Sequence, residues 1–173
     1  GKKIIDLNLT EKEREDLYDL FLLTAKPILY LYNYRNTPPA LSENLKKKNH
    51  LLLDIKMEEE LSEMSEREIQ DLGVKPKIYE LIKKSYQLLD LITFFTMNEN
   101  EIRAWEIERG TKAPQAGGKI HSDFEEKFIR AEVISWEKLI ESGSWQKAKD
   151  KGLIKTVGKD YEVNDGDVIY FVI

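Results

Sequence analysis

Apolar and polar positions divide the chain into two stretches of different character. Residues 1–90 combine helical spacing with short apolar runs, whereas residues 91–173 are dominated by β-branched and aromatic segments between turn residues. These patterns are typical of different kinds of packing. We therefore expect a domain boundary near Asp90 and two domains, residues 1–90 and 91–173.

Helix-start signals occur twice in the first stretch. Thr10 and Glu13 have the spacing of a capping box, in which the hydroxyl and the carboxylate each accept a hydrogen bond from a free amide at the helix start. They predict a helix over residues 9–20. Ser65 and Glu68 repeat the pattern inside a charged segment and predict another helix.

Two buried strands and a further helix are also predicted in the first stretch. The apolar runs at residues 27–32 and 51–53 are short and nearly continuous, which is typical of strands buried on both faces of a parallel sheet. Pro76 predicts the start of a helix, because proline is tolerated at the first helical position. That helix carries a core-facing stripe with i, i+3, i+4 spacing, formed by Ile78, Leu81, Ile82, Ser85, Leu88 and Leu89.

The second stretch predicts a small α+β domain. Its elements are two strands, a loop with one short helix, a strand, two short helices and two strands, over residues 91–96, 102–107, 110–118, 128–134, 136–142, 146–151, 160–163 and 168–172. Residues 97–101 suit a hairpin link, and residues 164–167 suit a tight turn with positive φ at Gly166. This order is that of a ubiquitin-like β-grasp, a mixed sheet packed on few helices.

Composition narrows the classes of function. The 173 residues include no cysteine, which excludes a disulfide framework, a cysteine zinc site and a thiol nucleophile and fits a reducing cytoplasm. No apolar run reaches the ~20 residues of a membrane-spanning helix, and the first residues lack the apolar core of a signal peptide. The net charge of −5 argues against binding of bare nucleic acid through bulk charge.

An ordered set of short motifs in the second stretch is specific to one family. The motifs are Leu-Ile-Thr-Phe-Phe-Thr at 91–96, Arg-Ala-Trp at 103–105, Arg-Gly-Thr at 109–111, Ala-Pro-Gln-Ala at 113–116, Ile-His-Ser-Asp-Phe at 120–124, Phe-Ile-Arg-Ala-Glu-Val-Ile at 128–134, Gly-Lys-Asp-Tyr at 158–161 and Asp-Gly-Asp-Val at 165–168. Each alone is a weak signal. Together they resemble the TGS domain of the YchF-type, or Obg-like, ATPases, which implies a β-grasp fold for residues 91–173.

The first stretch resembles the same family over a shorter motif. Residues 22–27, followed by an apolar strand and Asn33, are similar to the passage from the family's helical insertion back to its nucleotide-binding domain. The resemblance implies that residues 1–90 are a partial α/β G domain of the P-loop type, with helices.

In the family that this passage resembles, the strand ends in a base-recognition motif, which this sequence matches only at Asn33. The resemblance implies that Asn33, Asp54 and Ile55 contact the nucleotide base. Asn36 stands where the motif has glutamate, and Asp54 and Ile55 depart from its second part. The alternative for Asn33 is a loop residue that ends a strand and satisfies its own turn.

Nucleotide hydrolysis is not expected from this chain alone. Phosphoryl transfer needs a glycine-rich loop and a lysine around the phosphates, a hydroxyl and a carboxylate on Mg²⁺, and a positioned water. No G-x-x-x-x-G-K-S/T motif occurs, and Gly117-Gly118-Lys119 lacks the upstream glycine and the preceding strand. ATP or GTP and Mg²⁺ are implied for the intact family. We expect the phosphate-binding half of such a protein to lie outside this sequence, and no cofactor to be bound by this chain.

Other candidate chemistry is sparse. His121 and Asp123 in one loop suggest acid–base work, but no nucleophile accompanies them, and a histidine hydrogen-bonded to the backbone is the favoured alternative. Acidic residues are plentiful but show no spacing typical of a metal site. A carrier protein with a β-grasp fold would end in Gly-Gly, whereas this sequence ends in Phe171-Val172-Ile173, so a carrier function is not expected.

A basic and aromatic group in the second stretch predicts a small contact with RNA or the ribosome. Arginine and lysine pair with phosphates, and tryptophan stacks on bases. Residues 90–173 contain 12 Lys and Arg against 16 Asp and Glu, a net charge of −4, so a broad RNA-binding surface is not expected. The alternative is a core tryptophan among solvated charges. The group is Arg103, Trp105, Arg109, Lys112, Lys119, Lys127 and Arg130.

Two hypotheses follow for the function. In the first, the chain is the C-terminal region of a ribosome-associated P-loop ATPase or GTPase of the YchF type, cytoplasmic and monomeric, with no membrane partner. Its TGS domain then docks on the large ribosomal subunit, on RNA or on a protein. In the second, the chain binds ATP or GTP through Asn33 and the loop near Asp54 without hydrolysing it.

Overall fold

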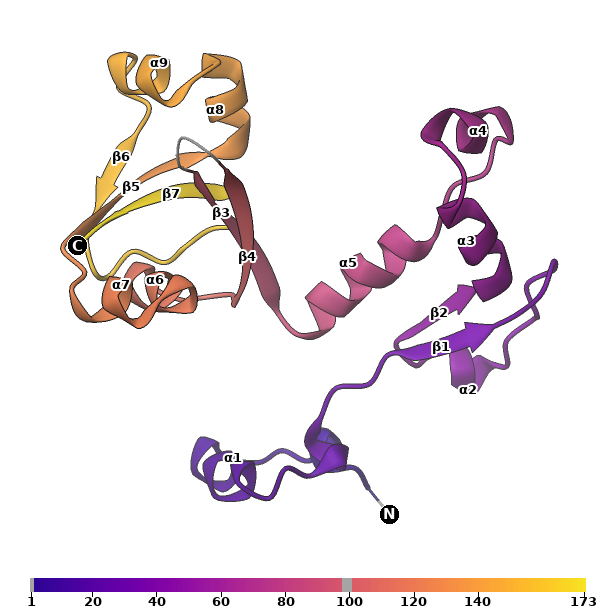
Figure 1. Ribbon diagram of the computed structural model, residues 1–173. Coiled ribbons are helices and arrows are strands. Elements are labelled where there is room, and N and C mark those ends of the chain that lie inside the picture. Colours follow the sequence, from indigo (N-terminus) through magenta and orange to yellow (C-terminus); the bar gives the residue numbers. More distant parts are fainter. Residues whose placement is uncertain (1, 98–100) are drawn as a thin grey trace. The chain divides into compact units, whose positions relative to one another are not determined.

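The chain has a mixed α+β fold with two compact units, Gly1–Leu89 (unit 1) and Asp90–Ile173 (unit 2). The computed structural model describes residues 2–97 and 101–173. Figure 1 shows the elements of both units in chain order.

Unit 1 is built around a two-stranded parallel sheet. Strand β1 (Tyr30–Asn33) pairs in register with β2 (His50–Leu53), so that Asn33 lies beside Leu53 at the carboxyl end. The helices are η1 (Ile4–Asp6), α1 (Glu11–Tyr18), η2 (Leu23–Ala25), α2 (Glu43–Lys46), α3 (Ile55–Ser62), α4 (Glu66–Asp71) and α5 (Ile78–Leu88).

Both predicted capping boxes are confirmed. The Thr10 hydroxyl accepts from the Glu13 amide at the start of α1, and Ser65 accepts from the Glu68 amide at the start of α4. Each glutamate in turn accepts from the amide of its capping residue at 2.8 Å. Reciprocal bonds of this kind satisfy two free donors and fix where a helix begins.

Three expectations for unit 1 are wrong in detail. Strand β1 is not buried on both faces, because Leu31 and Asn33 are exposed. Pro76 does not open a helix; α5 begins two residues later, after its capping residue Lys77. The apolar stripe of α5 is also not a core face, since none of its residues is buried and Ile82 is 50% exposed. Within the stripe, Leu81, Ser85 and Leu88 are half buried.

Unit 2 is a five-stranded mixed sheet in the order β4-β3-β7-β5-β6. Strands β3 and β4 pair antiparallel, and the central β7 pairs parallel with β3 and antiparallel with β5. The elements are β3 (Leu91–Met97), β4 (Ile102–Glu108), α6 (Ala113–Ile120), α7 (Ser122–Glu126), β5 (Arg130–Ser135), α8 (Trp136–Ser142), α9 (Trp145–Asp150), β6 (Lys155–Val157) and β7 (Asp167–Val172).

The sheet of unit 2 has a different set of side chains on each face. Towards α6 and α7 it presents the main core, in which Phe94 and Phe171 meet edge to face with ring centroids 6.2 Å apart. The opposite face carries a smaller core of Ile134, Ala148 and Val168, packed with side chains from α8 and α9. Because side chains alternate along a strand, adjacent residues of β7 serve different faces.

Three expectations for unit 2 need correction. The short helix expected within residues 110–118 is present as α6, but it continues to Ile120, and a second helix that was not expected, α7, follows it. Residues 160–163 form no strand; Glu162 makes only an isolated bridge with Lys112, and the strand lies earlier, at β6. The last strand therefore does not belong to a terminal hairpin. The predicted hairpin link at 97–101 falls largely on residues 98–100, which lie outside the described residues.

The expected turn before β7 is confirmed, with φ of +83° at Gly166. Asp167 holds this turn, because its carboxylate accepts from the Tyr161 hydroxyl at 2.7 Å and from the Asn164 amide at 2.8 Å. Burial, followed by the hydrogen bond to Asp167, raises the pKa of Tyr161 to about 12. The turn also ties β7 to β3, since the Gly166 amide donates to the Thr93 carbonyl at 2.8 Å.

Candidate functional site

Two of the residues expected to recognise a base come together at the carboxyl ends of β1 and β2. Asn33 is the last residue of β1, and Asp54 follows β2. This edge of an open parallel sheet is where ligands commonly bind. The Asn33 side-chain oxygen accepts a hydrogen bond from the Ile55 amide at 3.2 Å. Asn33 and Asp54 are therefore connected through Ile55, the residue that follows Asp54.

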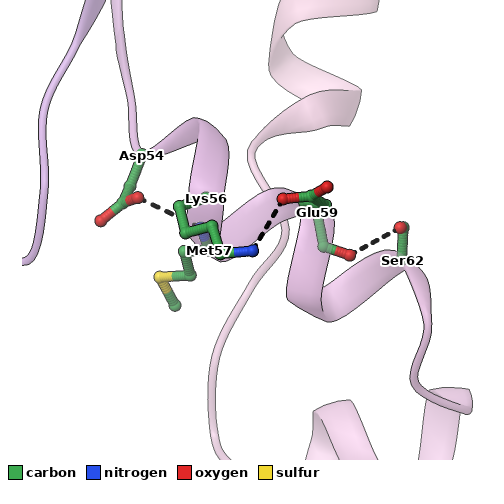
Figure 2. A network of polar contacts seen from close by, with 5 residues as sticks. All are labelled: Asp54, Lys56, Met57, Glu59 and Ser62. Atoms are coloured by element: carbon green, nitrogen blue, oxygen red, sulfur yellow. Dashed lines mark hydrogen bonds and ion pairs between the residues drawn. The ribbon is translucent and has the colours of Figure 1, made fainter.

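Asp54 is committed to holding the local backbone. Its carboxylate accepts from the Asn36 amide at 2.8 Å and from the Met57 amide at 3.1 Å, and the residue is 7% exposed. Figure 2 shows the bond to Met57 at the start of α3, where Lys56 also lies, with Glu59 and Ser62 further along the helix. The donors Asn36 and Met57 hold the pKa of the Asp54 carboxyl below its ordinary value.

This arrangement leaves little for a nucleotide base. Both Asp54 oxygens and the Asn33 oxygen accept from backbone amides, and Ile55 offers only an apolar side chain that is half exposed. A purine edge is read by paired donors and acceptors. Of the three residues Asn33, Asp54 and Ile55, only Asn33 keeps a side-chain donor, its amide nitrogen, for such a pairing. Asn33 thus ties the end of β1 to the start of α3, and this bond does not lie within its own turn, as the alternative had it.

The basic residues expected to contact RNA are mostly neutralised by neighbouring carboxylates. Within unit 2, nitrogen–oxygen distances of 2.9–3.6 Å join five of the six to acidic side chains. The pairs are Arg103–Glu101, Arg109–Asp90, Lys112–Asp160, Lys119–Glu106 and Lys127–Asp123. Trp105 is half buried against the main core, and its indole donates to the Thr96 hydroxyl at 2.9 Å. The charge of five of the six is therefore balanced by a neighbouring carboxylate.

Arg130 is the exception. It is exposed at the start of β5, and within the described parts of the chain no carboxylate lies at ion-pair distance from it. Its cross-strand partner on β7 is Val172, and Tyr170 is the next residue of β7 on the same face. This is the sheet face that α8 and α9 cover in part.

A groove of about 640 Å³ opens on this face beside α9, and we call it the Tyr170 groove. Tyr170 is 55% exposed although the residues on either side of it, Ile169 and Phe171, are buried. An exposed aromatic ring beside an unpaired arginine can stack on a base while the arginine pairs with a phosphate. The groove is lined by Met97, Arg130, Glu132, Trp145, Lys149, Ile169, Tyr170 and Val172.

Sequence reasoning found Arg130 but missed Tyr170 and Trp145. Tyr170 lies in a continuous apolar run, which predicts burial, and its exposure depends on how far α9 reaches over the sheet. Trp145 lies at the start of α9, where no motif marks it. One signal was available: tyrosine has a polar hydroxyl, so in an apolar strand its ring can lie at the exposed edge of one face of a sheet.

Comparison with known proteins places the chain in a family. The profile of the family described as "YchF-GTPase_C: Protein of unknown function (DUF933)" matches residues 91–173. The chain is 39% identical over 182 residues to the ribosome-binding ATPase YchF of Bacillus subtilis, covering 95% of this chain and 50% of that protein. It is 40% identical over 195 residues to Obg-like ATPase 1 of Saccharomyces cerevisiae, covering 99% and 48%.

A solved structure gives the same result in three dimensions. The Schizosaccharomyces pombe YchF GTPase superposes with a TM-score of 0.81 at 30% identity, over 99% of this chain and 50% of that one. The chain belongs to the YchF/Obg-like ATPase family. It corresponds to the C-terminal portion of YchF proteins and spans about half the length of the curated relatives that it matches.

The remaining YchF motif with possible chemistry contains His121. Its ring nitrogen Nδ1 accepts from the Asp123 amide at 3.1 Å and caps α7, while the Asp123 carboxylate is 3.9 Å away. The histidine therefore positions a helix end.

Two further site classes find no support in the described residues. Across residues 2–97 and 101–173, no group of three or more His, Cys, Asp or Glu side chains is arranged to hold a metal ion. In the same residues, no helix combines the length and apolarity that crossing a membrane requires.

Proposed function

We propose that this chain is the C-terminal region of a YchF-type ribosome-associated P-loop ATPase or GTPase, and that its unit 2 is a TGS β-grasp module for docking. The strand order of unit 2, with the last strand parallel to the first in the centre of the sheet, supports the β-grasp assignment. The family match over residues 91–173 supports the TGS assignment. Unit 1, with its parallel strands, is the base-recognition end of a G domain.

The observation that carries the docking role is the Tyr170 groove. In a module with a net charge of −4, bulk attraction does not draw in RNA. A local contact needs an exposed ring and an unpaired cation together, and Arg130 beside Tyr170 supplies both. We assign the docking partner to the ribosome, through a single-stranded RNA segment that stacks on Tyr170. The proposed setting is cytoplasmic, with a monomeric chain.

Nucleotide hydrolysis is assigned to other parts of such a protein. The residues of this chain do not fit a Mg²⁺–triphosphate site, because they contain no P-loop motif and no metal-holding cluster in the described part. Residual binding of ATP or GTP through Asn33 is the weaker proposal, since its side-chain oxygen and the Asp54 carboxylate already accept from backbone amides.

Co-sedimentation with ribosomes at low salt tests the docking role. The chain is expected to pellet with ribosomes, and Arg130→Glu and Tyr170→Ala are each expected to weaken association by about tenfold, as loss of a central contact does. Lys138→Glu is the matched control, because this exposed residue of α8 lies outside the groove. Equal pelleting of Arg130→Glu and the wild type, or no pelleting of the wild type, would contradict the proposal.

A further inference from the structure

The outer edge of β2 in unit 1 has backbone groups with no partner strand. Within the described residues, β2 pairs only with β1. The Tyr30 amide donates to the Asn49 carbonyl at 2.9 Å and the Tyr34 amide to the Leu53 carbonyl at 3.1 Å. A parallel ladder uses alternate residues of each strand. The amides and carbonyls of the intervening residues, His50 and Leu52, therefore point to the outer edge.

A groove of about 460 Å³ follows this edge. The four consecutive residues 49–52 all line it, although successive side chains point to opposite faces of a strand. Only a groove that runs along the edge can touch all four. The remaining walls come from α2 with its following loop and from α5 with its capping residue: Lys46, Lys48, Lys77, Glu80 and Lys84.

The charge around this edge is positive. Four lysines line the groove against one carboxylate, Glu80, which lies 4.0 Å from Lys84. The Lys46 ammonium is 2.8 Å from Glu43, at the surface. Lys48 and Lys77 have no carboxylate at ion-pair distance within the described part of unit 1. Their ammonium groups lie 4.7 Å and 5.7 Å from the ring centres of Tyr30 and Tyr34.

We propose that this groove binds an acidic peptide segment in extended conformation, which adds to β2 as a further strand. An added strand needs both donors and acceptors along the edge. His50 and Leu52 each offer one amide donor and one carbonyl acceptor there. Carboxylates on the peptide then meet the lysines on either side. A nucleic acid strand fits less well, because the two outward carbonyls repel phosphate oxygens.

Lysines near an edge strand can also act as guards against aggregation. Such guards stand on the strand itself, whereas β2 reads His-Leu-Leu-Leu and carries no lysine. Here the charges come from neighbouring elements and leave the strand backbone accessible. The arrangement therefore selects partners by charge and does not block the edge.

Fluorescence polarisation with the full chain tests this proposal. The probe is a labelled dodecapeptide of alternating Glu and Thr. Lys48→Glu and Lys77→Glu, made separately, are each expected to weaken its binding by at least about tenfold. Lys83→Glu is the control, because it makes the same charge change on an exposed residue of α5 outside the groove. Its affinity should stay within about twofold of the wild type.

Hydrogen exchange distinguishes an added strand from simple charge attraction. Saturating peptide is expected to slow exchange of the His50 and Leu52 amides. Binding without this protection would overturn the proposal. So would equal binding of a dodecapeptide in which Lys replaces Glu, unchanged affinity in both groove variants, or tighter binding of an oligouridylate at the same groove.

Discussion

At the scale of single residues, the two buried carboxylates of the described chain, Asp54 and Asp167, organise backbone. Asp54 accepts from two amides on separate segments, and Asp167 joins Tyr161 to the turn before β7. Both are among the few buried charged residues. A buried carboxylate is tolerated when its oxygens are hydrogen-bonded. These residues therefore stabilise loops.

Asp54→Ala is expected to destabilise unit 1 and to flatten its dependence on acid pH. The folded pKa of this carboxyl lies below its ordinary value of about 3.9, so its contribution to stability is present above that value and is lost as the pH falls through the lowered folded pKa. Thermal melts between pH 2 and 7 measure this. Asp54→Asn keeps a capping side chain without the charge, and an unchanged pH profile in that variant would contradict the assignment.

Tyr161 is expected to ionise later than an ordinary tyrosine. Its pKa of about 12 lies above the ordinary value of about 10, so its contribution to stability is complete below pH 10 and is lost as the pH rises through the folded pKa. Ultraviolet titration of tyrosinate should show one late group among the 8 tyrosines. Tyr161→Phe should remove that late step, and its persistence would assign the step to another residue.

At the scale of elements, local pattern predicted position well where a strand or cap is self-contained. The capping boxes, β3, β4 and β7 follow from spacing and residue type. Helix α6 does not, because it contains Gly117 and Gly118, which lower helix propensity. A Cβ at Gly117 would lie 3.0 Å from the Phe124 Cβ, so the close packing of α6 on α7 explains the glycine.

Tertiary contacts also explain why a strand was predicted at residues 160–163 while the actual strand, β6, was not predicted. Residues 160–163 alternate polar and apolar side chains, which predicts a strand, but their backbone partners lie in the loop before α6 and at the first residue of that helix. The Val163 amide donates to the Thr111 carbonyl, and Tyr161 accepts from the Ala113 amide through its own carbonyl. Strand β6 is three residues long and exists through its pairing with β5. Neither arrangement is encoded in local spacing.

Two glycines of unit 2 offer a matched test of the turn before β7. Gly166 and Gly143 have nearly equal positive φ, +83° and +82°. A Cβ at Gly166 would lie 2.6 Å from Cδ1 of Trp136, whereas one at Gly143 would meet nothing within 4 Å. Gly143→Ala should cost about 1 kcal/mol from backbone strain, and Gly166→Ala about 2–3 kcal/mol. Urea unfolding measures both, and equal losses would contradict the proposed contact.

At the scale of the whole molecule, the two units differ in how much they bury. Unit 2 has a core of aromatic and β-branched residues on one face and a second, smaller core on the other. In unit 1, α5 has no buried residue and the sheet has only two strands. The family assignment rests on sequence identity over both units, with 95% or more of the chain matched in two relatives.

The site was less predictable from sequence than the family. The motifs identified Arg130, Asn33 and Asp54 as candidates. Whether each can bind a ligand depends on the hydrogen bonds and ion pairs that its side chain already makes. Five of six candidate cations carry a carboxylate partner that residue order alone does not reveal. Conversely, Tyr170 became a candidate only because α8 and α9 leave part of the sheet uncovered.

The Tyr170 groove is the proposed point of contact with the ribosome. The most direct test replaces Tyr170 with a photo-crosslinking phenylalanine derivative in the full chain and irradiates the sample with ribosomes. Tyr79, exposed on α5 of unit 1, takes the same replacement as the control. We predict crosslinks to ribosomal RNA from position 170 and few from position 79. Crosslinks from position 79 with none from position 170 would contradict the account.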